Sequence, residues 1–150
     1  MILGIHHVAV SVSDMETALA FYRDLLGFDV VQEADWDRDS PLADQVIGLP
    51  ESAARMSMLR AGNAHIELFQ YSNPPAEDRR ARPCDHGYTH FALQVEDIQA
   101  EYDRLQTGGM SFVGPPVDFG TSSAIYGADP FGNVIELYEI RDSRLSQISR

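Results

Sequence analysis

The chain is poor in cysteine and in basic residues. Of its 150 residues only Cys84 is a cysteine, so no disulfide can form within the chain, and this fits a reducing cytosol. Lysine and arginine together number 11 against 23 aspartates and glutamates, which gives a formal net charge of −12. A surface this acidic repels phosphate backbones and anionic lipid headgroups. We therefore expect no nucleic-acid partner.

Long apolar runs are also missing. No uninterrupted apolar stretch approaches 18 residues, and no basic segment followed by a long apolar one opens the chain. We therefore expect no membrane anchor and a cytoplasmic location. The 44% of hydrophobic and 23% of charged residues match an ordinary globular protein. The length predicts a single domain over residues 1–150.

The chain contains an internal repeat. The segment His7–Asp14 aligns with His90–Asp97 at an offset of 83 residues, with His over His and Asp over Asp. Further on, Gly62–Leu68 resembles Gly132–Leu137, with Glu67 and Glu136 at an offset of 69. Two matched segments in the same order predict two copies of one structural module.

The two copies differ in length. We place the modules at about residues 4–72 and 87–140, joined by a polar linker rich in proline. The two offsets differ by 14 residues, so the first copy has the longer middle, and we assign the excess to residues 37–54. Insertions on a rigid scaffold often cover binding sites, so we expect this segment to select the substrate.

Local patterns predict the same element order in both modules. Ser13 and Glu16 have the spacing of a capping box, Gly27 is expected to end the first helix, and Asp97 is expected to cap the second. Apolar residues recur at helical spacing after each cap, and β-branched apolar runs elsewhere predict strands. The sequence thus predicts an α+β fold of two βαβββ modules. The expected strands are 5–12, 28–34, 55–61 and 65–71, then 89–95, 111–113, 122–128 and 134–140, with the second helix running from about Ile98 to Gly108-Gly109.

Four polar side chains occupy matched positions in the modules. Because side chains alternate across a strand, His7, Glu67, His90 and Glu136 all point away from the predicted helices. A two-fold pairing of the modules would bring these side chains together. Imidazoles with carboxylates suit a divalent transition metal, while hydrogen bonds among the same four groups are the alternative. By the same alternation we expect His6 on the helix side, partly buried.

Several motifs resemble one protein family over residues 5–139. They are Ile5-His-His-Val-Ala-Val10, the run from Ser13 to Phe28 with Phe21-Tyr22 and Leu25-Leu26-Gly27, Gly87–Ala92, and Asp129-Pro-Phe-Gly-Asn133 with Glu136. Together they resemble the vicinal oxygen chelate superfamily, which includes glyoxalase I, bleomycin resistance proteins and extradiol dioxygenases. The resemblance implies a half-barrel sheet around one metal site, with the helices on the outer face.

The resemblance also implies roles for particular residues. The metal ligands fall on His7, Glu67, His90 and Glu136, holding one divalent ion among Ni, Co, Zn, Mn and Fe, with Glu67 or Glu136 as the catalytic base. We expect a small-molecule substrate and a homodimer, and the modules pair either within one chain or between chains. Side chains of the same strand faces are expected to line the substrate cavity, with an acid or base role open for His65: Ser11, Met58, His65, Phe69, Tyr71, Gln94 and Tyr138.

Three functions follow from this family. The first is a glyoxalase I-like lyase, isomerase or epimerase that acts on a small carbonyl compound through an enediolate. The alternatives are an Fe(II)-dependent extradiol-type dioxygenase, which would use His7, His90 and Glu136 and leave Glu67 surplus, and a non-enzymatic resistance protein. Glyoxalase I enzymes usually contact glutathione through an Arg and an Asn at the positions of Ser11 and Tyr71. This departure argues against glutathione as co-substrate.

Overall fold

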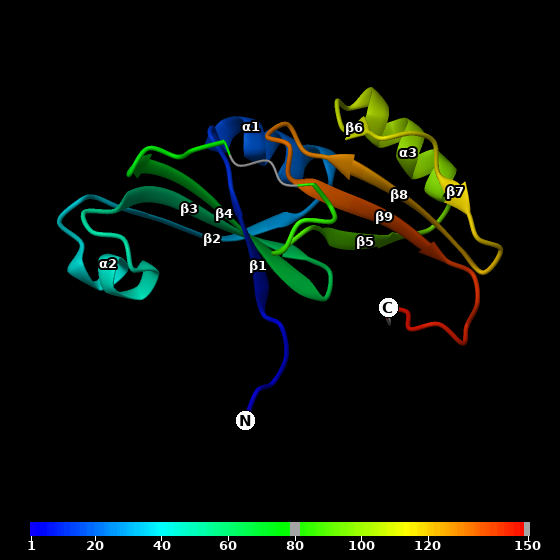
Figure 1. Ribbon diagram of the computed structural model, residues 1–150, viewed down its shortest axis with the longest axis horizontal. Coiled ribbons are helices and arrows are strands. Elements are labelled where there is room, and N and C mark those ends of the chain that lie inside the picture. Colours follow the sequence, from blue (N-terminus) through cyan, green and yellow to red (C-terminus); the bar gives the residue numbers. More distant parts are fainter. Residues whose placement is uncertain (79–81, 149–150) are drawn as a thin grey trace. The chain divides into compact units, whose positions relative to one another are not determined.

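The computed structural model describes residues 1–78 and 82–148; residues 79–81, part of the predicted linker, lie outside this range. The residues form two compact units, Met1–Arg79 and Arg80–Arg150. Each unit contains one mixed sheet with helices beside it (Figure 1). The predicted α+β fold is confirmed.

The first unit contains a four-stranded sheet. Its strands lie in the order β1-β4-β3-β2, with β1 parallel to β4 and the other pairs antiparallel. The elements along the chain are β1 (His7–Ser11), α1 (Met15–Leu19), the π-helix η1 (Ala20–Leu25), β2 (Asp29–Trp36), α2 (Pro41–Ile47), β3 (Ala53–Ala61) and β4 (Ala64–Asn73).

The second unit repeats this arrangement in fewer residues. Its strands lie in the order β5-β9-β8-β6, with β5 parallel to β9 and a further strand, β7, paired to β8. Its elements are β5 (Phe91–Val95), α3 (Ile98–Thr107), β6 (Ser111–Phe112), β7 (Val117–Asp118), β8 (Ser122–Ala128) and β9 (Val134–Ile140). The short strand β7 has no counterpart in the sequence prediction.

Strand register confirms the repeat. In the first unit Ala9 of β1 pairs with Glu67 of β4, and in the second Ala92 of β5 pairs with Glu136 of β9. The first and last strands of each module are therefore neighbours, aligned at equivalent residues. This places each predicted ligand histidine, two residues before the alanine, next to its module's glutamate.

The helix boundaries correct one prediction and confirm others. Asp14, not Ser13, caps α1, because Asp14 is the extended residue before the helix and its carboxylate accepts from the Thr17 N–H at 2.8 Å. Asp97 caps α3 as predicted, accepting from the Ala100 N–H. Gly27 follows the helix end with φ of 80°, a conformation that glycine adopts without strain. The expected first helix becomes π-helical from Ala20 onward.

The excess segment of the first module folds into α2. Pro41 begins the helix and Gly48, with φ of 72°, follows its end. The helix buries no side chain. It is held instead by Asp44, whose carboxylate accepts from the backbone N–H groups of Glu51 and Ser52 and from the Ser52 hydroxyl at 2.7–2.8 Å. These hydrogen bonds lower the pKa of Asp44.

Each sheet has a buried face and a more open face. In the first unit Ile66 and Leu68 are buried on the side where α1 packs against β4, together with Met15 and Tyr22. In the second unit Ile135 and Leu137 of β9 are buried on the side of α3 (Figure 1). Burying one such side chain contributes about 1.5–3 kcal/mol. Among the described residues, no helix has the length and apolar character needed to span a membrane.

Candidate metal centre

A histidine and a glutamate meet on the open face of the first sheet. Nε2 of His7 lies 3.2 Å from Oε2 of Glu67, and the two side chains are 39% and 15% exposed. Their strands β1 and β4 are adjacent and parallel, so the pair follows directly from the register. The alternation that buries Val10 and Leu68 turns His7 and Glu67 to the opposite face, as the sequence predicts.

The second sheet carries a matching pair. Nε2 of His90 lies 3.2 Å from Oε2 of Glu136, with side chains 25% and 18% exposed. Thus both units present the same two atoms, Nε2 and Oε2, at the same separation. Two copies of one geometry at positions related by the repeat argue for a shared purpose.

The donor atoms suit a divalent metal. Imidazole nitrogen and carboxylate oxygen bind Zn²⁺ at about 2.1 Å, so two donors on one ion lie about 3.4 Å apart at the tetrahedral angle and about 3.0 Å apart at right angles. The observed separations of 3.2 Å lie between these two values. Within residues 1–78 and 82–148, no group of three or more potential metal-binding side chains is gathered, and each unit brings together one histidine and one glutamate.

The residue before each histidine contacts its second ring nitrogen. Nδ1 of His6 lies 2.9 Å from Nδ1 of His7, and the Thr89 hydroxyl lies 3.0 Å from Nδ1 of His90. The expectation of a partly buried, helix-facing His6 is wrong, because His6 is exposed. It precedes β1, where strand alternation does not apply. Its ring stacks on His65 with centroids 4.8 Å apart.

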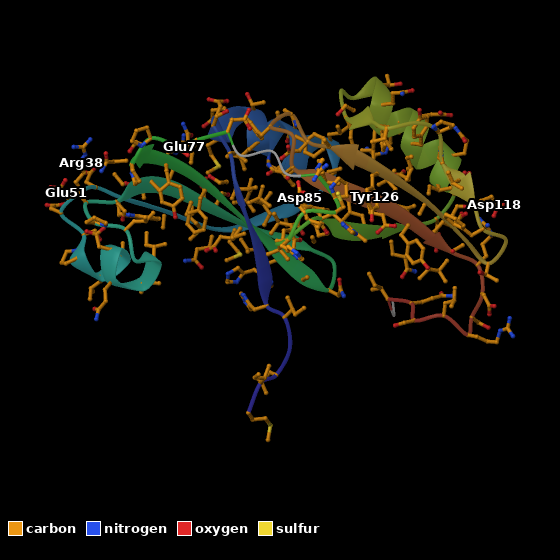
Figure 2. All side chains as sticks on the ribbon, viewed as in Figure 1. Arg38, Glu51, Glu77, Asp85, Asp118 and Tyr126 are labelled. Carbon is orange, nitrogen blue, oxygen red and sulfur yellow. The ribbon has the colours of Figure 1, made fainter. Side chains whose placement is uncertain are left out.

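Tyr126 lies beside the second pair and was not predicted from the sequence. This β8 residue, labelled in Figure 2, pairs with Glu136 across the sheet, its ring lies 4.6 Å from that of His90, and its hydroxyl is 3.4 Å from His90 Nε2. Its counterpart in the first unit is Met58, which pairs with Glu67. Met58 was predicted to line the cavity, and counting back across the second hairpin from Glu136 would have identified Tyr126 in the same way.

Aromatic rings adjoin Glu67 on the same sheet face. Phe69 and Tyr71 follow it along β4 with ring centroids 5.7 Å apart, and Trp36 of β2 lies 6.0 Å from Phe69 and 6.3 Å from Tyr71. Burial and, to a smaller extent, the negative charge of Glu67 raise the pKa of the Tyr71 phenol. The phenol therefore remains a hydrogen-bond donor at neutral pH. Trp36, also missed from sequence, donates its indole N–H to Ser52 at 2.9 Å.

The remaining predicted cavity residues lie on the expected strands. Ser11 is exposed on β1, and Met58 is buried beside Glu67. In the second unit Gln94 pairs with Tyr138, and its amide oxygen accepts from the N–H of Ile148 at 2.8 Å. The C-terminal segment thus returns to the strand that follows His90.

Comparison with known proteins gives the family. Residues 4–137 match the profile of the Glyoxalase/Bleomycin resistance protein/Dioxygenase superfamily. The chain is 32% identical to 2-epi-5-epi-valiolone epimerase from Actinomyces sp, over 92% of this chain and 80% of that protein. It is 29% identical to metallothiol transferase FosB from Staphylococcus epidermidis, over 91% of this chain and 82% of that protein.

A solved structure agrees. A glyoxalase family protein from Bacillus cereus superposes with a TM-score of 0.84 and 26% identity, covering 95% of this chain and 97% of that one. The two sequence relatives above are named as enzymes. On the profile match and these likenesses together, the chain belongs to the Glyoxalase/Bleomycin resistance protein/Dioxygenase superfamily.

Proposed function

We propose that the protein is a metal-dependent lyase, isomerase or epimerase that moves a proton on a carbon next to a carbonyl group. The observation that carries this proposal is the pair of His–Glu contacts, each with Nε2 and Oε2 3.2 Å apart, at repeat-related positions. Together they offer two imidazoles and two carboxylates, a set suited to a divalent transition metal such as Ni, Co, Zn, Mn or Fe.

In this proposal His7, Glu67, His90 and Glu136 hold the metal. A divalent metal held there would polarise the substrate carbonyl and stabilise the negative charge that develops on its oxygen. Glu67 or Glu136 takes the proton from the substrate carbon and returns it, since a carboxylate beside the reacting carbon acts as a general base. The two donor pairs come from one chain or from two chains of a homodimer.

The aromatic side chains next to Glu67 give the proposed substrate its surroundings. Trp36, Phe69 and Tyr71 would contact the apolar part of a small molecule, as ligand sites are mostly lined by apolar and aromatic groups. Trp36 donates a hydrogen bond to the Ser52 hydroxyl, which donates in turn to Asp44 of α2. The excess segment 37–54 therefore contacts this group of aromatic side chains directly. The other predicted cavity residues, Ser11, Met58, His65, Gln94 and Tyr138, keep that role as proposals.

The relative named as an epimerase supports an isomerase over the dioxygenase alternative. A dioxygenase of extradiol type needs two histidines and one carboxylate, with the remaining positions open to catechol and dioxygen. Glu67 is a second carboxylate in contact with His7 and would crowd those positions. The compound in that relative's name, 2-epi-5-epi-valiolone, is the first substrate to test.

Metal analysis tests the proposed centre. We expect the purified protein to bind about one Ni²⁺, Co²⁺ or Zn²⁺ per chain, and His7→Ala or His90→Ala to remove both metal and activity. Thermal unfolding in a chelator should hardly change, because both side chains lie on the open sheet faces rather than in the core. His86→Ala is the matched control, an exposed histidine outside the strands.

The outcomes separate the alternatives. Retention of metal by both ligand variants would contradict the centre, and bound iron with oxygen consumption would indicate the dioxygenase. Solvent-deuterium incorporation into the substrate carbon, followed by NMR, reports the proposed proton transfer directly. Mixing the His7→Ala and His90→Ala proteins restores metal binding only if the donor pairs come from different chains.

A further inference from the structure

In both proposed ligand histidines, the ring nitrogen that is not directed at the glutamate makes a contact of its own. In each, Nε2 is directed at the glutamate, and Nδ1 contacts the side chain of the preceding residue. The preceding residues are His6 and Thr89, and their separation of 83 positions equals that of His7 and His90. The contact therefore recurs at repeat-related positions although the residue type differs.

The contact at Nδ1 bears on which ring nitrogen carries the proton. A neutral histidine has one N–H and one free nitrogen, so a ring that binds metal through Nε2 carries its proton on Nδ1. That proton needs an acceptor, and the acceptor fixes both the tautomer and the ring orientation. The Thr89 hydroxyl, 3.0 Å from His90 Nδ1, is such an acceptor.

His6 can play the same part for His7. At 2.9 Å between the two Nδ1 atoms one nitrogen must carry a proton, so His6 accepts when its own proton is on Nε2. The His6 ring is held by neighbours of the same unit. It stacks on His65 with an interplanar angle of 18°, and the His65 backbone N–H donates to the His6 carbonyl at 3.2 Å.

We propose that His6 and Thr89 are positioning residues, which accept a hydrogen bond from Nδ1–H of His7 and His90 and so leave Nε2 free for the metal. This inference rests on the proposed metal centre. It adds two residues that do not bind the metal, and it gives His65 a role in orienting His6. Loss of such supporting groups typically lowers metal affinity 10–100-fold.

The test compares variants that keep or remove the acceptor. His6→Leu and Thr89→Val remove it, whereas His6→Asn replaces the ring nitrogen by an amide oxygen at a similar place and Thr89→Ser keeps the hydroxyl. Zn²⁺ affinity is measured by competition with a chelating indicator, and unfolding in chelator checks the fold. We expect His6→Leu and Thr89→Val to bind Zn²⁺ 10–100-fold more weakly than the parent protein. The variants His6→Asn and Thr89→Ser should bind Zn²⁺ within about threefold of the parent.

A second readout is independent of affinity. Proton NMR of the Zn²⁺-loaded protein should show slowly exchanging Nδ1–H signals for His7 and His90. His6→Leu should abolish only the first signal and Thr89→Val only the second. Because Thr and Val have nearly the same shape, the Thr89 arm remains decisive even if the His6 variant folds poorly.

The outcomes distinguish this inference from the proposed function. If His6→Leu and Thr89→Val bind Zn²⁺ within threefold of the parent while His7→Ala and His90→Ala bind it at least 100-fold more weakly, the positioning roles are overturned and the centre stands. Equal loss in the acceptor-keeping and acceptor-removing variants also overturns them. Full affinity in His7→Ala and His90→Ala overturns the centre itself.

Discussion

Glu67 is the residue that best separates the possible reactions. Glu67→Gln keeps an oxygen donor of similar size but removes the base. If Glu67 both binds metal and moves the proton, metal should largely remain while turnover falls about 10²–10⁴-fold, the usual contribution of a positioned acid–base group. Steady-state kinetics together with metal content measures both.

The control is a glutamate on the other face of the same sheet. Glu33 pairs with Ser57 and is exposed, so Glu33→Gln should leave turnover and metal content unchanged. Oxygen-dependent ring cleavage within about tenfold of the parent in Glu67→Gln would indicate the dioxygenase instead, since Glu67 would then act only by supporting a ligand.

At the residue scale, the sequence predicts which side chains share a sheet face better than it predicts which side chains they contact. His7, Glu67, His90 and Glu136 follow from a repeat and from strand alternation, and the structure forms both His–Glu contacts inside the units. The contact of His6 with His7 could not be predicted, because His6 precedes the strand and alternation says nothing of its direction. Tyr126 was predictable from the pairing of β8 with β9, which places it opposite Glu136. The repeat does not reveal it, because the equivalent residue in the first module is a methionine.

At the scale of the element, Gly127 of β8 has to be glycine. A Cβ there would lie 2.6 Å from Met110 Cε, 2.7 Å from the Ser111 carbonyl oxygen and 2.8 Å from Phe112 Cδ1. The Ser111 oxygen belongs to the backbone of β6, which pairs with β8 at this point, so it cannot move without breaking the pairing. We expect Gly127→Ala to lower the free energy of unfolding by about 1–3 kcal/mol in urea titrations.

Gly114→Ala serves as the matched control. Its Cβ meets nothing within 4 Å, and its φ is not in the left-handed region, so stability should stay within about 0.5 kcal/mol of the parent. Equal stabilities for the two variants would contradict this expectation, because they would show that β6 and β8 can accommodate the added methyl group.

Element types and most boundaries were predictable where a pattern was continuous. The strand at 122–128 has the predicted bounds. The second helix begins at Ile98 as predicted, because Asp97 caps it, and it ends at Thr107, just before the predicted stop at Gly108-Gly109. The helix α2 was not predicted, although Pro41 and Gly48 are ordinary start and stop residues. It has no buried apolar stripe, with Leu42 and Val46 exposed, and is held by Asp44 instead. A helix without a buried apolar side cannot be predicted from hydrophobic periodicity.

At the scale of the whole molecule, net charge and sheet-face chemistry bear on the substrate. The repeat made the module architecture predictable, since each module buries one sheet face under its own helix and leaves the His–Glu pair on the other. The formal charge of −12 disfavours anionic substrates. Next to the first pair the sheet offers the rings of Trp36, Phe69 and Tyr71, which suit an apolar or ring-shaped compound.

We therefore expect the hemithioacetal of methylglyoxal and glutathione to be a poor substrate. Glutathione is anionic, and Ser11 and Tyr71 offer neither the charged nor the amide group that its carboxylates would need. The kcat/KM for this compound should fall below about 10⁴ M⁻¹ s⁻¹, the lower end of ordinary enzymes, whereas a value near 10⁶ M⁻¹ s⁻¹ would contradict the expectation. Ser11→Arg supplies one charge-assisted hydrogen bond, worth about 1.5 kcal/mol, so it should raise this kcat/KM about tenfold. Ser11→Gln, which adds length without charge, should not raise it, because the missing feature is the cation rather than the size of the side chain.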